Sequence, residues 1–302
     1  MKRMLVVLGI LVVCVASSHG DGSDAAVIKS GGDFTVRVVQ DIAFYDGPDA
    51  DPVKHKLDLY LPEGHKDFPV LLFVHGGAWR SGDKKYLFDV YGKIGRVFAK
   101  NGIGTVVTNY RLSPKVQHPK HIEDVARAFA WTHKHIKEYG GRPDQIFVSG
   151  HSAGGHLVAL LATDERYLKA EKLGLDQIKG VAPISGVYRI PAGTKAFAAV
   201  FGDDEVGRRQ ASPLNHVNGK HPPFLILYAD KDFPTCDRIS EEFCKSLKAC
   251  GCDAASREIK ERDHISIITH LGKEEDPATQ ALLEFLARHA GLKLQEKKSS
   301  TP

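Results

Sequence analysis

The stretch that most constrains the fold is an apolar run that breaks into a glycine-flanked serine and then into a helix. Residues 145–148 are predicted to form a buried strand and residues 153–162 a helix. Between them lies the motif Gly-His-Ser-Ala-Gly at residues 150–154. Glycine fits where one backbone crowds another, so its two glycines indicate a sharp, strained turn. Such a turn would hold Ser152 above a sheet, at the positive end of the following helix, and it predicts a nucleophilic serine.

The rest of the chain alternates between strands, most of them apolar, and helices. Strands are predicted at residues 33–45, 53–61, 69–74, 103–110, 145–148, 178–184, 224–229 and 255–261. Helices are predicted at residues 85–100, 121–139, 153–162, 236–249 and 277–289. This alternation predicts an α/β fold, a mostly parallel eight-stranded sheet with helices on both faces. Since chemistry in such sheets gathers beyond the carboxyl ends of the strands, the partners of Ser152 are expected there.

The serine hydroxyl needs a base within hydrogen-bond reach. His264 lies between the last predicted strand and the last predicted helix and is the predicted base. His270, later in the same connection, is the alternative. His151 precedes the serine directly and is interpreted as a packing or pocket-wall residue.

A carboxylate is needed to orient that base, and three aspartates follow the strand at residues 224–229. These are Asp230, Asp232 and Asp237. Asp232 is preferred because it stands past the bend of the chain, and Asp230 remains the alternative. Each of the three could instead have a purely structural role, because aspartates commonly cap turns.

The developing oxyanion of an acyl-transfer reaction needs hydrogen-bond donors. The strand at residues 69–74 runs into His-Gly-Gly-Ala-Trp at residues 75–79, where two glycines leave backbone N–H groups unshielded. We expect the N–H of Gly76 or Gly77 to act together with that of Ala153, the residue after the serine.

With these motifs the chain resembles the α/β-hydrolase esterases and lipases that carry His-Gly-Gly. It is close to the hormone-sensitive-lipase-like esterases and the bacterial feruloyl-esterase-like proteins. The order Ser152, Asp232, His264 is the chain order of α/β-hydrolases. The resemblance implies this fold and a Ser-His-Asp triad, but it is weakly specific for substrate. The matching segments are residues 75–79, 109–114 (Asn-Tyr-Arg-Leu-Ser-Pro), 150–155, 229–232 and 263–264.

The helical cap of the lipase-like relatives is expected to be small or absent here, because little chain precedes the first strand. The irregular stretch at residues 186–223 is the only candidate cover, so an open, shallow site is expected. Trp79, Tyr188, Phe201 and Ile265 are the candidate substrate-binding residues of its wall.

An open site with aromatic walls suits short acyl or aromatic esters, including acetyl or feruloyl esters of plant polysaccharide. The prediction is therefore a serine ester hydrolase that acts on a small-molecule or polysaccharide ester without a cofactor or metal. An amide hydrolase is the alternative, because kynurenine-formamidase-like enzymes also carry His-Gly-Gly-x-Trp. A non-catalytic binding scaffold of the same fold is disfavoured, because no triad residue is missing. The formal charge of +4 is not concentrated in a basic patch with interleaved aromatics, so no nucleic-acid partner is predicted.

The N-terminus has the pattern of a secretory signal peptide. Lys2 and Arg3 precede an apolar run at residues 4–16, which is shorter than the ~20 residues of a spanning helix. We predict a signal peptide at residues 1–20, a catalytic domain at residues 21–292 and a polar tail at residues 293–302. The protein would then be secreted or periplasmic, with no stable membrane insertion. A lipoprotein anchor at Cys14 is less favoured because the bulky Val13 precedes it.

Export would place the other cysteines in an oxidising space. These are Cys236, Cys244, Cys250 and Cys252, and one local disulfide is expected among them, with its pairing left open. A zinc site built from all four is disfavoured because the spacing lacks paired Cys-x-x-Cys.

Overall fold

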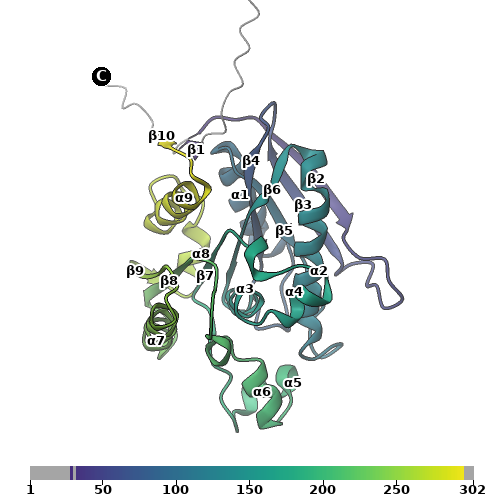
Figure 1. Cartoon of the computed structure of the whole chain (residues 1–302), viewed down its shortest axis with the longest axis vertical. Helices are drawn as coiled ribbons and strands as arrows, with labels where there is room; N and C mark the ends of the chain where they lie inside the picture. The colour runs from purple at the N-terminus through teal and green to yellow at the C-terminus, as the bar shows by residue number, and fades with distance from the viewer. Residues whose placement is uncertain (1–27, 30–31, 296–302) are drawn as a thin grey trace, which may run out of the picture.

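The computed structural model describes residues 28–29 and 32–295 (Figure 1). The predicted signal peptide, Cys14 and most of the predicted polar tail lie outside the described residues. Within the described part, no helix is both long enough and apolar enough to span a membrane.

One large sheet organises the chain, and its eight strands lie in the order β2-β3-β5-β4-β6-β7-β8-β9. β2 runs antiparallel to β3 and β3 antiparallel to β5, whereas every other neighbouring pair is parallel. The predicted mostly parallel eight-stranded sheet is therefore confirmed. The strands are β2 Val36–Ala43, β3 Lys56–Pro62, β4 Phe68–Val74, β5 Gly104–Thr108, β6 Gly141–His151, β7 Gly180–Ile184, β8 Phe224–Lys231 and β9 Ala254–Asp263. A separate parallel pair joins β1 (Ile28–Lys29) to β10 (Leu294–Gln295).

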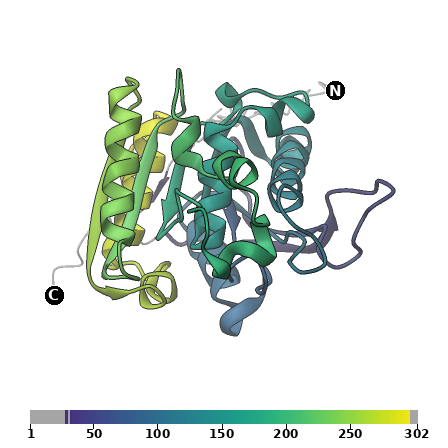
Figure 2. The ribbon, with the colours of Figure 1, turned by 90° about the horizontal axis from the view of Figure 1, so that it is seen from below.

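Helices cover both faces of this sheet (Figures 1 and 2). The apolar strand β4 shows why: Leu71 and Phe73 belong to one core cluster, and Val70, Leu72 and Val74 belong to the other. Successive side chains of a strand point to opposite faces, so an unbroken apolar run needs cover on both sides. The first cluster packs under α1 (Tyr86–Lys100) and α9 (Pro277–Ala290), and the second under α2 (Lys120–His135), α3 (Ala153–Thr163) and α7 (Cys236–Ala249).

The stretch predicted to be irregular contains short helices. They are α5 (Lys195–Phe201), α6 (Glu205–Gln210) and the 3₁₀ turn Pro213–His216, and they follow α4 (Arg166–Ala170) and a 3₁₀ turn at Leu175–Gln177 along the chain. Helices of fewer than two turns carry almost no periodicity, which is why the sequence did not reveal them. α5 and α6 lie at the end of the molecule opposite β1 and β10 (Figure 1).

The predicted local disulfide is wrong, because all four described cysteines are free thiols. Cys244 is buried on α7, where it packs as a small apolar side chain. The Cys250 thiol donates to the carbonyl of Val217 (3.4 Å) and the Cys252 thiol to that of Pro222 (3.1 Å).

Several histidines are held neutral in the interior. Burial lowers the pKa of His156 on α3 to about 3. Its Nδ1 accepts the indole N–H of Trp79 (3.2 Å), and its Nε2–H donates to the carbonyl of Ala211 (2.7 Å). This ring therefore connects α3 to the segment that follows α6. The pKa of each other member of the group is likewise lowered by burial, to about 4 for His75, His118 and His121 and to about 3 for His151.

Because the pKa values of these buried histidines are lowered, we expect the protein to lose stability in mild acid. The unfolded chain takes up protons near its ordinary histidine pKa of ~6.5, whereas the folded chain does so only near pH 3 to 4. The free energy of unfolding should therefore fall from pH 7 to pH 5 by about 2 kcal/mol per buried histidine. Urea denaturation at several pH values measures this. His156→Gln keeps a donor and an acceptor, so it should lose less stability over that range, and a pH dependence identical to wild type would contradict the account.

Candidate active site

The serine lies on a strained turn between β6 and α3. Ser152 has φ 55° and ψ −114°, a conformation that costs a non-glycine residue energy and persists only where the surroundings impose it. A Cβ on Gly150 would lie 2.7 Å from the backbone carbon of Gly154, and one on Gly154 would lie 2.1 Å from the carbonyl oxygen of Val74. The backbone crowding predicted from these two glycines is thus confirmed. The turn itself is fixed by the Ser152 N–H, which donates to the carbonyl of Ile184 (2.9 Å).

The structure brings Ser152, His264 and Asp232 into one hydrogen-bonded line. His264 Nε2 lies 3.0 Å from Ser152 Oγ, and His264 Nδ1 lies 2.7 Å from Asp232 Oδ1. The alternatives are occupied elsewhere. Asp230 accepts the backbone N–H of Arg262 (3.0 Å), and the His270 ring is bonded to the carbonyl of Ser266 (2.9 Å). Asp232 can reach His264 because it follows the end of β8, whereas Asp230 still lies within the strand.

Asp232 is held as a carboxylate by the groups around it. Burial alone would raise its pKa, but hydrogen bonds from His264 and Ser185 outweigh burial and hold the pKa well below its usual range. The Ser185 hydroxyl donates a hydrogen bond to the Asp232 carboxylate (2.5 Å). The backbone N–H groups of Ala229 (3.2 Å) and Phe233 (2.8 Å) donate to the same carboxylate. An ionised Asp232 accepts the Nδ1–H of His264, which leaves Nε2 as the acceptor that faces the serine.

Two aromatic rings clamp the histidine. His151 packs against it at a centroid distance of 4.7 Å with 46° between the planes, and the neutral His151 Nε2–H donates to the carbonyl of His264 (2.8 Å). Phe233 lies against His264 at 4.1 Å with 29° between the planes. The sequence predicted that His151 packs or lines the pocket wall, but it did not predict the hydrogen bond from His151 to the His264 carbonyl. The contact of Phe233 with His264 was not predicted either. The position of Phe233, directly after Asp232, is the signal that could have revealed it.

Two backbone amides are available beside the serine. The Gly76 N–H donates to the hydroxyl of Tyr91 (3.0 Å), so it is already engaged. Within the described part of the chain, the N–H groups of Gly77 and Ala153 have no acceptor. The donor pair that fits an oxyanion is therefore Gly77 with Ala153. Gly76 instead allows a close approach to the serine turn, since a Cβ there would lie 3.0 Å from both Nδ1 and the carbonyl oxygen of His151.

The loop that carries these glycines is braced by the Asn-Tyr-Arg-Leu-Ser-Pro motif. Tyr110 stacks on His75 at 4.4 Å, and its hydroxyl donates to the His75 carbonyl (3.2 Å). The next residue, Arg111, donates two hydrogen bonds to the buried Asp124 carboxylate, from Nε (2.9 Å) and Nη2 (2.7 Å). A bidentate arginine–carboxylate pair fixes geometry as well as charge, so it anchors the segment that supports the glycine loop.

Three of the four predicted wall residues belong to the core. Trp79 is 3% exposed, Phe201 7% and Tyr188 0%, so none of them forms an open wall. Phe201 meets Trp79 edge-on at 4.9 Å, and Tyr188 stacks on Phe243 at 4.4 Å. Large aromatic rings in short covering segments are what attach those segments to the body of the molecule. Only Ile265, 51% exposed and next to His264, remains at the surface of the site.

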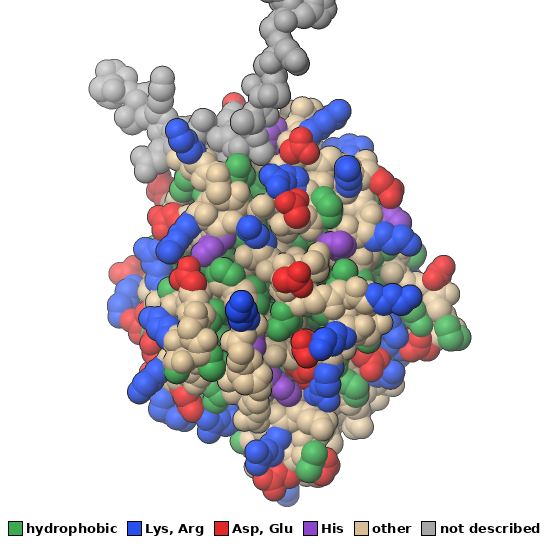
Figure 3. Space-filling view, viewed as in Figure 1, with side chains coloured by type: hydrophobic (Ala, Val, Ile, Leu, Met, Phe, Trp, Pro, Cys, Tyr) green, Lys and Arg blue, Asp and Glu red, His purple; other side chains and the backbone are tan. Residues whose placement is uncertain are grey.

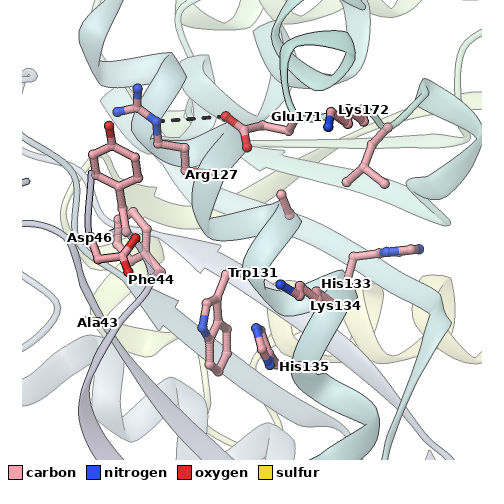
Figure 4. Close-up of a pocket in the computed structure, with 13 residues that line it drawn as sticks. Ala43, Phe44, Asp46, Arg127, Trp131, His133, Lys134, His135, Glu171 and Lys172 are labelled. Carbon is pink, nitrogen blue, oxygen red and sulfur yellow. Dashed lines mark ion pairs between the residues drawn. The ribbon is translucent and has the colours of Figure 1, made fainter. Parts of the chain in front are cut away.

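A cavity of about 640 Å³ lies away from the serine, between the end of β2, α2 and residues 171–173. Figure 4 shows Trp131 and His135 on one side of it and the Arg127–Glu171 ion pair on the other. The triad residues do not line it. On the face drawn in Figure 3, acidic and basic side chains are interspersed. In the described residues, no group of three or more His, Cys, Asp or Glu side chains could hold a metal ion.

A mostly parallel eight-stranded sheet, with a serine on a strained turn between a central strand and a helix, defines the α/β-hydrolase fold, and the chain belongs to this fold class. Solved structures agree. A truncated carbohydrate esterase from gut microbiota superimposes with a TM-score of 0.73 at 19% identity, and the match covers 87% of this chain and 99% of that one.

Sequence comparisons confirm the predicted resemblance to esterases of this fold. The family model BD-FAE matches residues 57–184. Esterase LipQ of Mycobacterium tuberculosis is 29% identical over 77% of this chain, which spans 58% of LipQ. Kynurenine formamidase of Danio rerio is 28% identical, and the match covers 87% of this chain and 88% of that enzyme. The relatives therefore include both an esterase and a formamidase.

A test of the turn compares two glycines. Gly154→Ala should lower the free energy of unfolding by about 3 kcal/mol, because the new methyl group would collide with the Val74 carbonyl. Gly207→Ala is the matched control on α6, where a Cβ would meet only the end of the Asp204 side chain at 3.3 Å. That change should alter stability by less than about 1 kcal/mol. Urea denaturation distinguishes the two, and equal effects would contradict the crowding argument.

Proposed function

We propose that the chain is a serine carboxylic-ester hydrolase. The observation that carries the proposal is the unbroken line of hydrogen bonds from Ser152 through His264 to Asp232, together with the amides of Gly77 and Ala153, which have no acceptor among the described residues. A nucleophile, a base, an orienting carboxylate and oxyanion donors are the complete set that acyl transfer to serine requires. Esterase LipQ and the BD-FAE family match support the same reaction class.

In the first half of the proposed reaction, Ser152 Oγ attacks the ester carbonyl carbon while its proton passes to His264 Nε2. The carbonyl oxygen becomes an oxyanion and accepts the N–H groups of Gly77 and Ala153. One such donor contributes about 3 kcal/mol of transition-state stabilisation. The carbon–oxygen bond to the alcohol then breaks, the alcohol takes the proton from His264, and an acyl-serine remains.

The second half repeats these steps with water. His264 Nε2 removes a proton from water, whose oxygen attacks the acyl carbon of Ser152. The second oxyanion collapses, the acid leaves, and the proton returns to Ser152 Oγ. Throughout, Asp232 stays ionised and stabilises the imidazolium, in keeping with its lowered pKa.

The proposed substrates are short-chain or aromatic esters, with acetyl or feruloyl esters of plant polysaccharide as the natural class to test. Support for small substrates comes from Ile265, which is 51% exposed next to His264, whereas Trp79, Tyr188 and Phe201 are buried in the core. The proposal includes export, because residues 1–20 have the signal-peptide pattern.

An arylformamidase is the second candidate function. Its support is the match to kynurenine formamidase of Danio rerio, which spans most of both chains. The same triad can attack a formamide, because only the leaving group differs. Against it stands the N-terminal signal pattern, since an exported enzyme would not meet a cytosolic metabolite.

A substrate comparison separates the two functions. The enzyme should hydrolyse p-nitrophenyl acetate with a higher kcat/KM than N-formylkynurenine, and Ser152→Ala should abolish both activities. A preference for the formamide would favour the second candidate. Ester hydrolysis that survives in Ser152→Ala would contradict the proposed nucleophile.

The two neighbouring aspartates provide a matched pair of variants. Asp232→Asn should lower kcat by about 10⁴-fold with little change in KM, because an amide no longer holds His264 in the working tautomer. Asp230→Asn should leave kcat close to the wild-type value, since Asp230 binds only backbone on the β9 side. Steady-state kinetics on p-nitrophenyl acetate measures both. Similar losses in the two variants would overturn the assignment of Asp232.

A further inference from the structure

Two of the most exposed large hydrophobic side chains flank His264. In the described residues, the large hydrophobics with more than half of their surface exposed are Val53, Val206, Phe233 and Ile265. Phe233 follows Asp232 on the β8 side, and Ile265 follows His264 on the β9 side. An apolar ring exposed beside catalytic groups costs solvation, so it points to an apolar partner at that place.

The backbone holds Phe233 in a defined place. Its N–H donates to Asp232 Oδ1 (2.8 Å), the same oxygen that His264 Nδ1 contacts at 2.7 Å. One face of the phenyl ring rests on the imidazole at 4.1 Å, and 63% of the side chain remains exposed to solvent. The free part of this ring therefore presents a flat apolar surface that is fixed relative to the reacting atoms.

The positions of the other groups decide which half of an ester meets this surface. The oxyanion donors come from the β4 loop and the start of α3, so they set the direction of the carbonyl oxygen. His264 Nε2 gives its proton to the leaving oxygen, so the alcohol half has to lie next to the imidazole. Phe233 and the buried His151 pack on that imidazole, and of these two only Phe233 is exposed to solvent; the exposed Ile265 is the next residue along the chain from His264.

We propose that Phe233 and Ile265 form an apolar shelf that binds the alcohol half of the ester. The shelf selects esters of aromatic alcohols, whose flat ring can stack on Phe233, over esters of small alkyl alcohols. Within the proposed range of substrates it therefore favours esters with an aromatic alcohol half over the polysaccharide esters, whose alcohol half is a sugar. This inference rests on the proposed ester hydrolysis and adds the side of the substrate on which selection occurs. Phe233 is thus a specificity-determining residue as well as a packing partner of His264.

Three esters test the shelf. Benzyl acetate carries a ring on the alcohol half, methyl phenylacetate carries it on the acyl half, and ethyl acetate carries none. Phe233→Ala should lower kcat/KM for benzyl acetate about tenfold, the scale of one lost aromatic contact in a partly desolvated site. The values for the other two esters should fall by less and by the same factor as each other, because those esters lose only the packing of Phe233 on His264. Phe233→Tyr should restore the preference, and Val53→Ala, which removes an equally exposed hydrophobe elsewhere, should leave all three unchanged.

Other outcomes overturn the shelf. An equal loss on all three esters means that Phe233 acts only by positioning His264. A loss confined to methyl phenylacetate places the acyl half on the shelf. Labelling of Ser152 by a fluorophosphonate separates these failures from that of the proposed function. Labelling with an unchanged ester preference overturns the shelf alone, whereas absence of labelling overturns ester hydrolysis and the shelf with it.

Discussion

The close approach of Gly154 to the end of β4 is the constraint on which the rest of the site depends. A side chain at residue 154 would collide with the Val74 carbonyl, so the start of α3 can lie against the strand only if that residue is glycine. This approach places Ser152 and the Ala153 amide beside the glycine loop that follows β4. One packing contact therefore brings Ser152 and the Ala153 amide close to the loop that carries Gly76 and Gly77, although the two segments are distant in the sequence.

The second requirement is a histidine that cannot turn away from the serine. His264 is held at both ring nitrogens, at its carbonyl by His151, and on its faces by two aromatic rings. The carboxylate that orients it is in turn kept ionised by Ser185 and by backbone amides. Preorganised dipoles of this kind lower a barrier because little reorganisation is needed during the reaction. The connections after β7, β8 and β9 thus act as one unit.

The fold and the three central residues could be predicted from the sequence because each leaves a local signal. Buried parallel strands are continuous apolar runs, and Ser152 and Asp232 each follow such a run. His264 instead follows the edge strand β9, and its signal is its place between the last strand and the last helix. Contacts that depend on the approach of distant segments left no such signal. The capture of the Gly76 amide by Tyr91 is one example, and the burial of Trp79 under Phe201 is another. The free thiols are a third, because spacing alone does not reveal that their partners are carbonyl groups.

Covalent capture of the serine tests the central claim most directly. The intact protein is treated with a fluorophosphonate, and the adduct is mapped by peptide mass spectrometry in the wild type and in Ser152→Ala. One adduct is expected, on Ser152; it should be lost in the variant and form much more slowly when His264 is replaced by alanine. An adduct on another residue, or labelling that persists in Ser152→Ala, would contradict it.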